Sequence, residues 1–203
     1  GRNRDLFSLA VLDAHKVAQV HKLRRPIGRQ DHMAAAHGGL RLYAFEGDGA
    51  RVERSFSNED AEWVASHLAL LQLPEGHDSR AILSNVKSTD QLQISYDAIP
   101  VAVRAIEEHS PVLLGEALDM CQVSKMKIPG AVTSAISGII ETIDDLSTSS
   151  GNIYGCKVAG AGGGGHVVVC CEPEAVNAIS LMTGLPALRV EADLGGVRSE
   201  GWA

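Results

Sequence analysis

The chain has 203 residues, of which 45% are hydrophobic and 21% are charged, and its formal net charge is −7. This length allows one domain or two small ones with a real core, and the composition is ordinary for a soluble globular protein. The negative charge argues against a broad nucleic-acid-binding surface, which needs a basic face, but a local basic pocket can still hold a phosphorylated small molecule.

Apolar runs and cysteines bear on location and redox state. No apolar run approaches the roughly 20 residues that span a bilayer, and the first residues lack the apolar core of a secretory signal. The four cysteines form no CxxC pair: Cys121, Cys156, Cys170 and Cys171. We therefore expect buried reduced thiols in a cytoplasmic protein, with no membrane partner, no disulfide framework and no metal site.

The first part of the chain predicts a helix over residues 6–23, a short helix over 31–37, a β-hairpin made of 40–45 and 51–54, and a helical turn over 58–65. Helical spacing of apolar residues indicates the first helix, and alternation indicates the hairpin. Asp31 suits the N-cap of the short helix and Gly38-Gly39 suits its end, while Ser57 or Asn58 suits the cap of the helical turn. Composition changes near residues 56–66, where we place a domain boundary.

The second part of the chain predicts a sheet with helices. In chain order its elements are a strand over 67–73, a polar loop over 75–80, helices over 81–108, 112–126 and 130–146, strands over 154–159 and 166–171, a helix over 173–182 and a strand over 187–192. Pro100 is expected to kink or break the first of these helices, and Ser110 to cap the second. One tight strand pair, with helices between the other strands, indicates an α+β sandwich built on an antiparallel sheet.

Arg80 is a candidate ligand-binding residue. It ends a polar loop that follows a buried strand, a common location for ligand contacts. Because it also opens the next predicted helix, it can hold a phosphate or carboxylate together with that N-terminus. A solvated arginine fits the same spacing equally well.

A run of glycines, interrupted by Ala161, fills residues 160–165 between two predicted strands. Glycine allows positive φ and close approach of another surface, so the run predicts a turn pressed against a ligand or a neighbouring loop. It is not a P-loop, because the GK[ST] ending is absent and Lys157 precedes the glycines. It is not a dinucleotide fingerprint either, because a strand follows it.

Two segments together resemble the GHMP superfamily of small-molecule kinases. Residues 155–165, Gly-Cys-Lys-Val-Ala-Gly-Ala-Gly-Gly-Gly-Gly, look like the third motif of that superfamily. Residues 28–40 (Gly-Arg-Gln-Asp-His-Met-Ala-Ala-Ala-His-Gly-Gly-Leu) are similar to its sugar branch, in particular to the D-glycero-D-manno-heptose 7-phosphate kinase type. The resemblance implies a remnant of an S5-like first domain over 1–62, followed by a ferredoxin-like α+β sandwich, the GHMP kinase C-terminal domain, over 63–203.

The same resemblance implies an activity and roles for individual residues. It implies transfer of the γ-phosphoryl group of ATP, with Mg²⁺, to a hydroxyl of a sugar or sugar phosphate. Asp31 stands where the sugar kinases have the catalytic carboxylate that accepts or orients the hydroxyl proton. The residues implied to bind the sugar or its phosphate are Arg29, Gln30, His32 and Arg80. Those implied to line the nucleotide phosphates are Gly160, Ala161, Gly162, Gly163 and Gly164.

The sequence departs from the superfamily pattern in three places, one of which is the lack of the N-terminal strand that carries the superfamily's first motif. The superfamily binds ATP phosphates through a serine-rich loop that precedes the Asp31 region, and no such loop stands here. We therefore expect a second polypeptide, or the rest of a longer protein, to supply that half, and the open hairpin edge invites such pairing. His32 replaces a glutamine that often follows the aspartate, so the acceptor sugar stays open.

Three other interpretations remain at this stage. The chain can be a non-catalytic binding or assembly module that retains the fold. It can act on another acceptor, such as galactose, fucose or a polyol. The chain can also form a homo-oligomer, since its sequence leaves the oligomeric state open.

Overall fold

The computed structural model describes residues 30–46, 49–74, 76, 79–86 and 92–196. The helix expected over residues 6–23, and Arg29, lie outside the described residues. The described residues divide into two units, one with those up to Glu62 together with those from Ala192, and the other with those from Trp63 to Glu191. The sequence-based assignment of two kinase domains stays a prediction.

In the first unit, the described elements are α2 (Gln30–His37), β1 (Arg41–Glu46), β2 (Gly49–Ser55) and the start of α3 (Asn58–Ser66). β1 and β2 form the expected antiparallel hairpin. Ser57 caps α3, because its Oγ accepts a hydrogen bond from the Asp60 amide at 3.0 Å while Asp60 Oδ2 accepts one from the Ser57 amide at 2.9 Å. Asp31 lies inside the first turn of α2, which begins at Gln30, so its expected place at the N-cap is wrong.

In the second unit, the elements are β3 (Leu68–Gln72), α4 (Ser79–Leu83), α5 (Gln93–Glu108), α6 (Pro111–Met126), α7 (Ser134–Ser150), β4 (Ile153–Val158), β5 (His166–Cys171), the 3₁₀ turn η3 (Pro173–Ala175), α8 (Val176–Thr183) and β6 (Ala187–Arg189). The four strands pair in the order β4-β5-β3-β6, and every pair is antiparallel. With α7 before β4 and α8 between β5 and β6, this is the ferredoxin-like arrangement. The predicted α+β class is confirmed.

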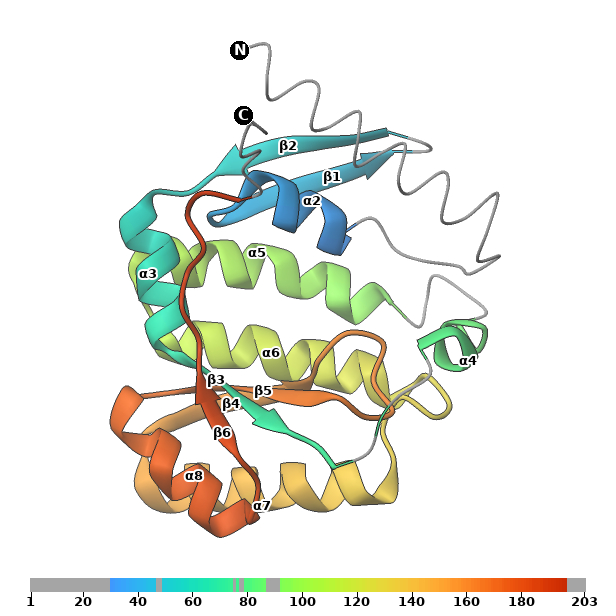
Figure 1. The fold of residues 1–203 in the computed structure, drawn as a ribbon, viewed down its shortest axis with the longest axis vertical. Coiled ribbons are helices and arrows are strands. Elements are labelled where there is room, and N and C mark those ends of the chain that lie inside the picture. Colours follow the sequence, from blue (N-terminus) through green and yellow to red (C-terminus); the bar gives the residue numbers. More distant parts are fainter. Residues whose placement is uncertain (1–29, 47–48, 75, 77–78, 87–91, 197–203) are drawn as a thin grey trace, which may run out of the picture. The chain divides into compact units, whose positions relative to one another are not determined.

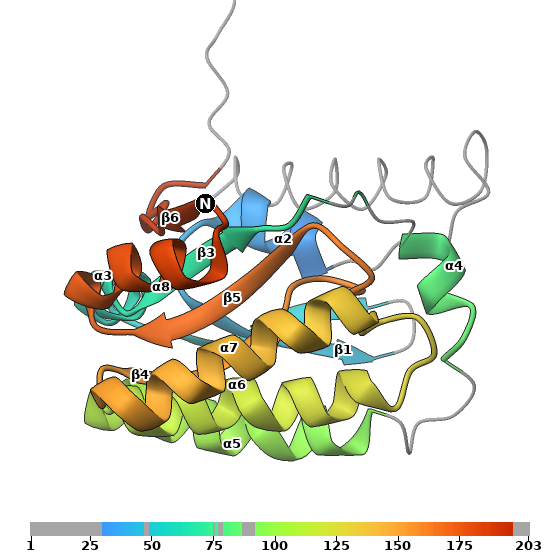
Figure 2. The same cartoon turned by 90° about the horizontal axis from the view of Figure 1, so that it is seen from below.

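Alternation along the strands divides the sheet into two faces. Val167 and Val169 of β5 are fully buried in the main core, which also contains side chains of α7 and α8. Cys170, one residue further, belongs instead to a cluster with Leu114 of α6 and Ala105 of α5. Helices α7 and α8 therefore cover one face of the sheet, and α5 and α6 lie on the other (Figures 1 and 2).

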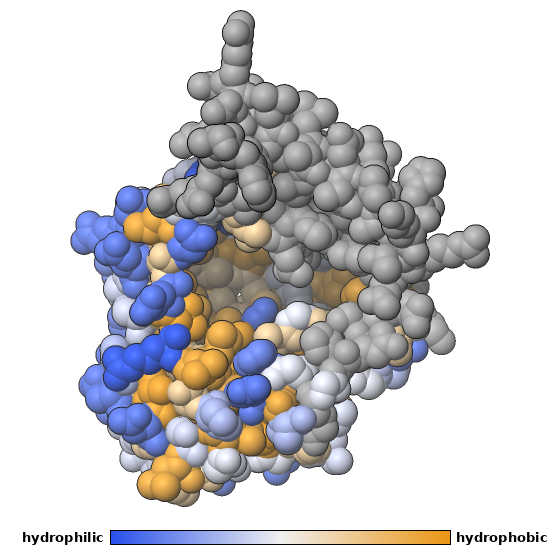
Figure 3. Space-filling model, viewed as in Figure 1, coloured by the Kyte–Doolittle hydropathy of each residue, from blue (hydrophilic) through white to orange (hydrophobic). Residues whose placement is uncertain are grey.

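Helix α8 is apolar on more than its core side. Val176 and Ile179 are buried against the sheet, whereas Leu181 and Met182 are exposed. Leu188 of the neighbouring edge strand is also exposed, and Figure 3 shows apolar surface over this part of the second unit. Single exposed apolar side chains are common, so these residues do not by themselves define a site.

The predicted helix over 81–108 is wrong as a continuous element. Helix α4 ends at Leu83, and α5 begins only at Gln93. Polar side chains favour the turn after α4, because Ser84 Oγ donates to the Ala81 carbonyl and Asn85 Nδ2 donates to the Pro129 carbonyl.

Pro100, by contrast, does not break α5. It lies inside the helix and is exposed, so the carbonyl it leaves without a helical partner can reach water. Helix α6 begins as predicted, with Ser110 Oγ accepting a hydrogen bond from the Leu113 amide and proline at the first turn.

Candidate functional site

The glycine turn joins β4 to β5, as the sequence predicts. All five of its glycines have positive φ: Gly160 at 55°, Gly162 at 91°, Gly163 at 77°, Gly164 at 153° and Gly165 at 85°. The turn closes through the Ala159 amide, which donates to the His166 carbonyl at 2.9 Å, and the Gly162 amide, which donates to the Ala159 carbonyl at 3.1 Å. A side chain is strained in such a backbone, so the sequence of small residues follows from the turn geometry.

Part of this turn is fixed by packing within the protein. The Gly163 amide donates to the Ala131 carbonyl at 2.7 Å, and a Cβ placed on Gly162 would lie 2.4 Å from the same oxygen. A Cβ on Gly163 would lie 2.3 Å from Ile82 Cδ1. Gly160 differs, because a Cβ there would meet nothing within 4 Å. Gly162 and Gly163 therefore serve close packing of the turn, whereas its Gly160 side stands open.

Helix α6 positions the turn by running beside the edge strand β4 (Figure 2). The two approach closely at Gly115 and Gly155, where a Cβ on Gly155 would lie 2.3 Å from the Gly115 carbonyl oxygen. Further along, Asp119 Oδ1 accepts a hydrogen bond from the Cys156 amide at 2.8 Å. These contacts occupy outward-facing groups of an edge strand, which would otherwise be free to pair with another chain.

Gln122 and Lys125 continue the same row of α6 contacts. Gln122 Oε1 accepts a hydrogen bond from the Val158 amide at 3.0 Å, and Lys125 Nζ donates to the Gly160 carbonyl. Gln122 is 6% exposed, and its Nε2 has no hydrogen-bond partner among the described residues. The row ends at the open side of the glycine turn.

The pKa values of three side chains near this row differ from their ordinary values. Burial lowers the pKa of Lys125, and the positive charge of Lys157 lowers it further. Partial burial raises the pKa of Asp119, to which the charge of Asp144 adds, while the hydrogen bond from the Cys156 amide opposes the rise. Burial raises the pKa of Cys156 to about 12, so this thiol stays protonated and is a poor nucleophile at neutral pH.

All four cysteines are free, and three of them are buried. Burial raises the pKa of Cys170 to about 12 and that of Cys171 to about 11. The described residues contain no group of three or more histidine, cysteine or acidic side chains that could hold a metal ion. No helix of the described residues is long and apolar enough to cross a bilayer.

The residues implied to bind and activate the sugar lie elsewhere in the chain. Gln30, Asp31 and His32 form the first turn of α2, and Arg80 is the second residue of α4. The structure describes only the backbone of these four residues. Because α2 belongs to the first unit and the glycine turn to the second, their convergence on one cleft stays a prediction.

Helix α2 is held firmly within its unit by two side chains of β1. Arg41 donates from Nε to the Gly38 carbonyl at 2.8 Å and from an Nη to the His37 carbonyl at 3.2 Å, which satisfies the end of α2. The Tyr43 hydroxyl donates to the Met33 carbonyl at 3.1 Å. These contacts fix the helix that carries Asp31.

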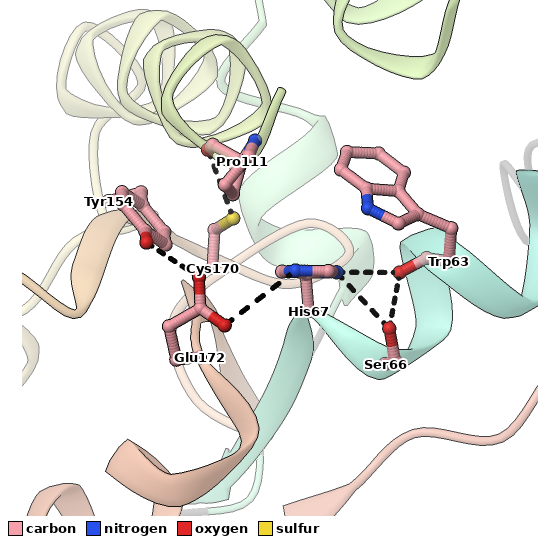
Figure 4. Close-up of polar contacts among 7 residues, drawn as sticks. All are labelled: Trp63, Ser66, His67, Pro111, Tyr154, Cys170 and Glu172. Carbon is pink, nitrogen blue, oxygen red and sulfur yellow. Dashed lines mark hydrogen bonds and ion pairs between the residues drawn. The ribbon is translucent and has the colours of Figure 1, made fainter. Parts of the chain in front are cut away.

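A second polar cluster, which the sequence did not reveal, lies at the opposite end of the β4–β5 hairpin (Figure 4). The Tyr154 hydroxyl donates to Glu172 Oε1 at 2.6 Å, and Glu172 Oε2 lies 3.9 Å from His67 Nε2. His67 Nδ1 lies 2.9 Å from the Trp63 carbonyl oxygen, to which only a protonated nitrogen can donate. The hydrogen bond to Glu172 is the main cause that raises the pKa of Tyr154 to about 12.

A family model matches part of the second unit. Residues 102–182 match the family model described as "GHMP kinases C terminal". No curated protein matches the sequence significantly. The matched segment runs from within α5 to within α8 and includes the glycine turn.

Three solved structures share the fold. One is a phosphomevalonate kinase from Streptococcus pneumoniae in complex with phosphomevalonate and AMPPNP. Its TM-score is 0.64 at 15% identity, and the alignment covers 93% of this chain and 61% of the kinase chain. A protein described as a sugar kinase from Campylobacter jejuni has a TM-score of 0.62 at 17% identity, covering 93% and 55%. A D-glycero-D-manno-heptose 1-phosphate kinase from Bacteroides thetaiotaomicron has a TM-score of 0.59 at 14% identity, covering 91% and 52%. The chain thus spans 52–61% of the length of these structures, and at such identities the likeness shows the fold alone.

Proposed function

We propose that this chain, which carries a GHMP kinase C-terminal domain over residues 102–182, is part of an ATP-dependent kinase for a hydroxyl of a sugar or sugar phosphate. The observation that carries the proposal is the family match across the glycine turn, which is held by α6 and by the loop at Ala131 with one side left open. The sugar class rests on the residues at 28–40 and on two of the three structural neighbours being described as sugar or heptose-phosphate kinases.

Within this proposal, Asp31 accepts or orients the proton of the attacking hydroxyl. The contacts of Arg41 and Tyr43 with α2 hold the backbone that carries this carboxylate. Positioning matters because phosphoryl transfer depends on alignment and electrostatics more than on covalent chemistry by the protein. Mg²⁺ would neutralise phosphate charge when it accompanies ATP, and the described residues contain no group of three or more histidine, cysteine or acidic side chains to hold it.

The ATP phosphate loop is proposed to come from a second polypeptide or from further residues of a longer protein. The chain spans 52–61% of the length of the three kinases compared above, which supports a complementary half. Calorimetry tests this proposal: ATP binding should be weak for the 203-residue chain and restored when a polypeptide carrying the serine-rich loop is added. Equal binding with and without that polypeptide would contradict it, and the non-catalytic module would then become the better interpretation.

The role of Asp31 is tested in the assembly that phosphorylates sugar. Asp31→Asn should lower kcat by about 10²–10⁴-fold, because the proton acceptor is lost while the side chain keeps its size. Glu53→Gln is the matched control, since it removes an exposed carboxylate from β2 of the same unit. Undiminished turnover in Asp31→Asn would remove this residue from the mechanism.

A further inference from the structure

Two lysines belong to the elements that hold the Gly160 side of the glycine turn. Lys125 stands in the last turn of α6 and donates a hydrogen bond from Nζ to the Gly160 carbonyl. Lys157 is the penultimate residue of β4, the strand that leads into the turn (Figure 1). Both residues are half-buried.

The direction of Lys157 follows from its neighbours in the strand. Cys156 and Val158 are buried in the core with α7 and α8. Gly155, two residues before Lys157, faces Gly115 of α6. Because alternate residues of a strand share a face, Lys157 points to the α6 side, where Lys125 also lies.

Neither ammonium group is neutralised within the described residues. No ion pair to a carboxylate is formed there by either lysine. Cys121 favours the charge of Lys125, while burial and the charge of Lys157 both act against it. Two like charges that are partly removed from water carry a free-energy cost that a bound anion relieves.

We propose that Lys125 and Lys157 bind a phosphate group at the Gly160 side of the turn. An ammonium group has three N–H donors, so Lys125 keeps two for a ligand after its contact with Gly160. Lysine is a common point-charge partner of phosphate, and the space beside Gly160 is open. The nature of the phosphate, nucleotide or sugar phosphate, rests on the proposed kinase function; the existence of the site does not.

A purely structural role for Lys125, pinning the turn, is the competing explanation. This explanation assigns no role to Lys157, which forms no hydrogen bond to the turn. Lys127 provides a matched control, because it is an exposed lysine just after the same helix end. The three variants Lys125→Met, Lys157→Met and Lys127→Met each remove one positive charge within a short stretch of the second unit.

The test is a calorimetric titration of the 203-residue chain with inorganic pyrophosphate, ATP and glucose 6-phosphate at two NaCl concentrations. We expect binding of at least one of these probes, about tenfold weaker in Lys125→Met and in Lys157→Met and within about twofold of the original in Lys127→Met, since a close charge contact to phosphate is lost only in the first two. ATP binding tighter than pyrophosphate would identify a nucleotide phosphate, and tighter binding of glucose 6-phosphate would identify a sugar phosphate.

Several outcomes would contradict the proposed phosphate site. Absence of binding by the unmodified chain to all three probes would do so, as would equal losses in all three variants, which would indicate non-specific charge. Loss in Lys125→Met alone would favour the structural role. A readout independent of affinity is the pKa of Lys125 by NMR, which should rise when pyrophosphate binds. Because none of these measurements involves turnover, a failure of the kinase proposal remains distinguishable from a failure of the site.

Discussion

The two ends of the β4–β5 hairpin are built in opposite ways. At one end, consecutive glycines and backbone carbonyls make a turn whose contacts are mostly to main-chain atoms, such as the Gly163 amide with the Ala131 carbonyl. At the other end, side chains from distant segments make the contacts, with Tyr154, Glu172 and His67 in a row. Gly162 and Gly163 leave no room for an added atom, whereas the polar end depends on particular functional groups.

The two ends therefore limit substitution in different ways: the glycine end through lack of space, and the polar end through its hydrogen bonds. A glycine fixed by a neighbouring backbone cannot be replaced without moving that backbone. A side-chain hydrogen bond can be removed without moving the backbone, at the cost of that bond and of any partner left without water. The hairpin therefore combines a rigid end next to the proposed phosphate site with an end whose contacts vary with pH.

The largest expected effect is at the glycine end. Gly162→Ala should lower the free energy of unfolding by about 3 kcal/mol or more, since it adds overpacking against Ala131 to the cost of a positive φ. Gly160→Ala is the control, because it shares the positive φ but has open space, and it should cost only about 1–2 kcal/mol. Urea unfolding measures both, and equal losses would show that packing does not distinguish the two glycines.

A smaller effect is expected at the polar end. Tyr154→Phe should lower the free energy of unfolding by about 1–2 kcal/mol, because a hydrogen bond to the Glu172 carboxylate is lost. Tyr96→Phe, at an exposed tyrosine of α5, should change it by less than about 0.5 kcal/mol. Similar values for the two variants would mean that the short contact adds nothing to stability.

The same bond predicts a response to alkali. The pKa of Tyr154 is raised to about 12 from an ordinary 10.0, so its contribution to stability is present below pH 10 and is lost as the pH rises towards 12. Absorbance titration should show one tyrosine that ionises late in the unmodified chain, with that component absent in Tyr154→Phe. A late component that persists in the variant would assign it to another tyrosine.

The smallest effect is expected from Asp119, beside β4. Its folded-state pKa is raised, so the protonated form is favoured in the folded chain and stability falls as the pH rises through that raised value from the ordinary aspartate range. Asp119→Asn keeps an oxygen that can accept from the Cys156 amide, and it should flatten this part of the pH profile. Asp97→Asn, on the exposed side of α5, should leave the profile unchanged; a flattened profile there would point to general charge effects.

The elements that the sequence predicted well have local causes. The hairpin of β1 and β2, the Ser110 cap of α6 and the glycine turn each depend on residues that are neighbours in the chain. The long helix over 81–108 failed because periodicity alone cannot detect the turn that Ser84 and Asn85 stabilise through backbone contacts.

The contacts that escaped prediction join distant segments. Gly115 and Gly155 meet at a helix–strand contact that neither local pattern indicates. The sequence did not mark Lys125 as a candidate site residue, because a lysine near a helix end is usually solvated. Its hydrogen bond to the Gly160 carbonyl distinguishes it from such a lysine. The roles implied for Asp31 and Arg80 stay predictions, because they depend on side chains and on an arrangement of units beyond what the structure describes.

The row of α6 side chains along β4 also bears on self-association. Aggregation by strand addition requires a free edge, and the sheet ends at β4 on one side and at the three-residue β6 on the other. Since Asp119 and Gln122 occupy the outward amides of β4, a foreign strand could dock there only after α6 had detached. Fibril growth from this sheet should therefore be limited by local opening of α6, a rate that hydrogen exchange at Cys156 and Val158 would report.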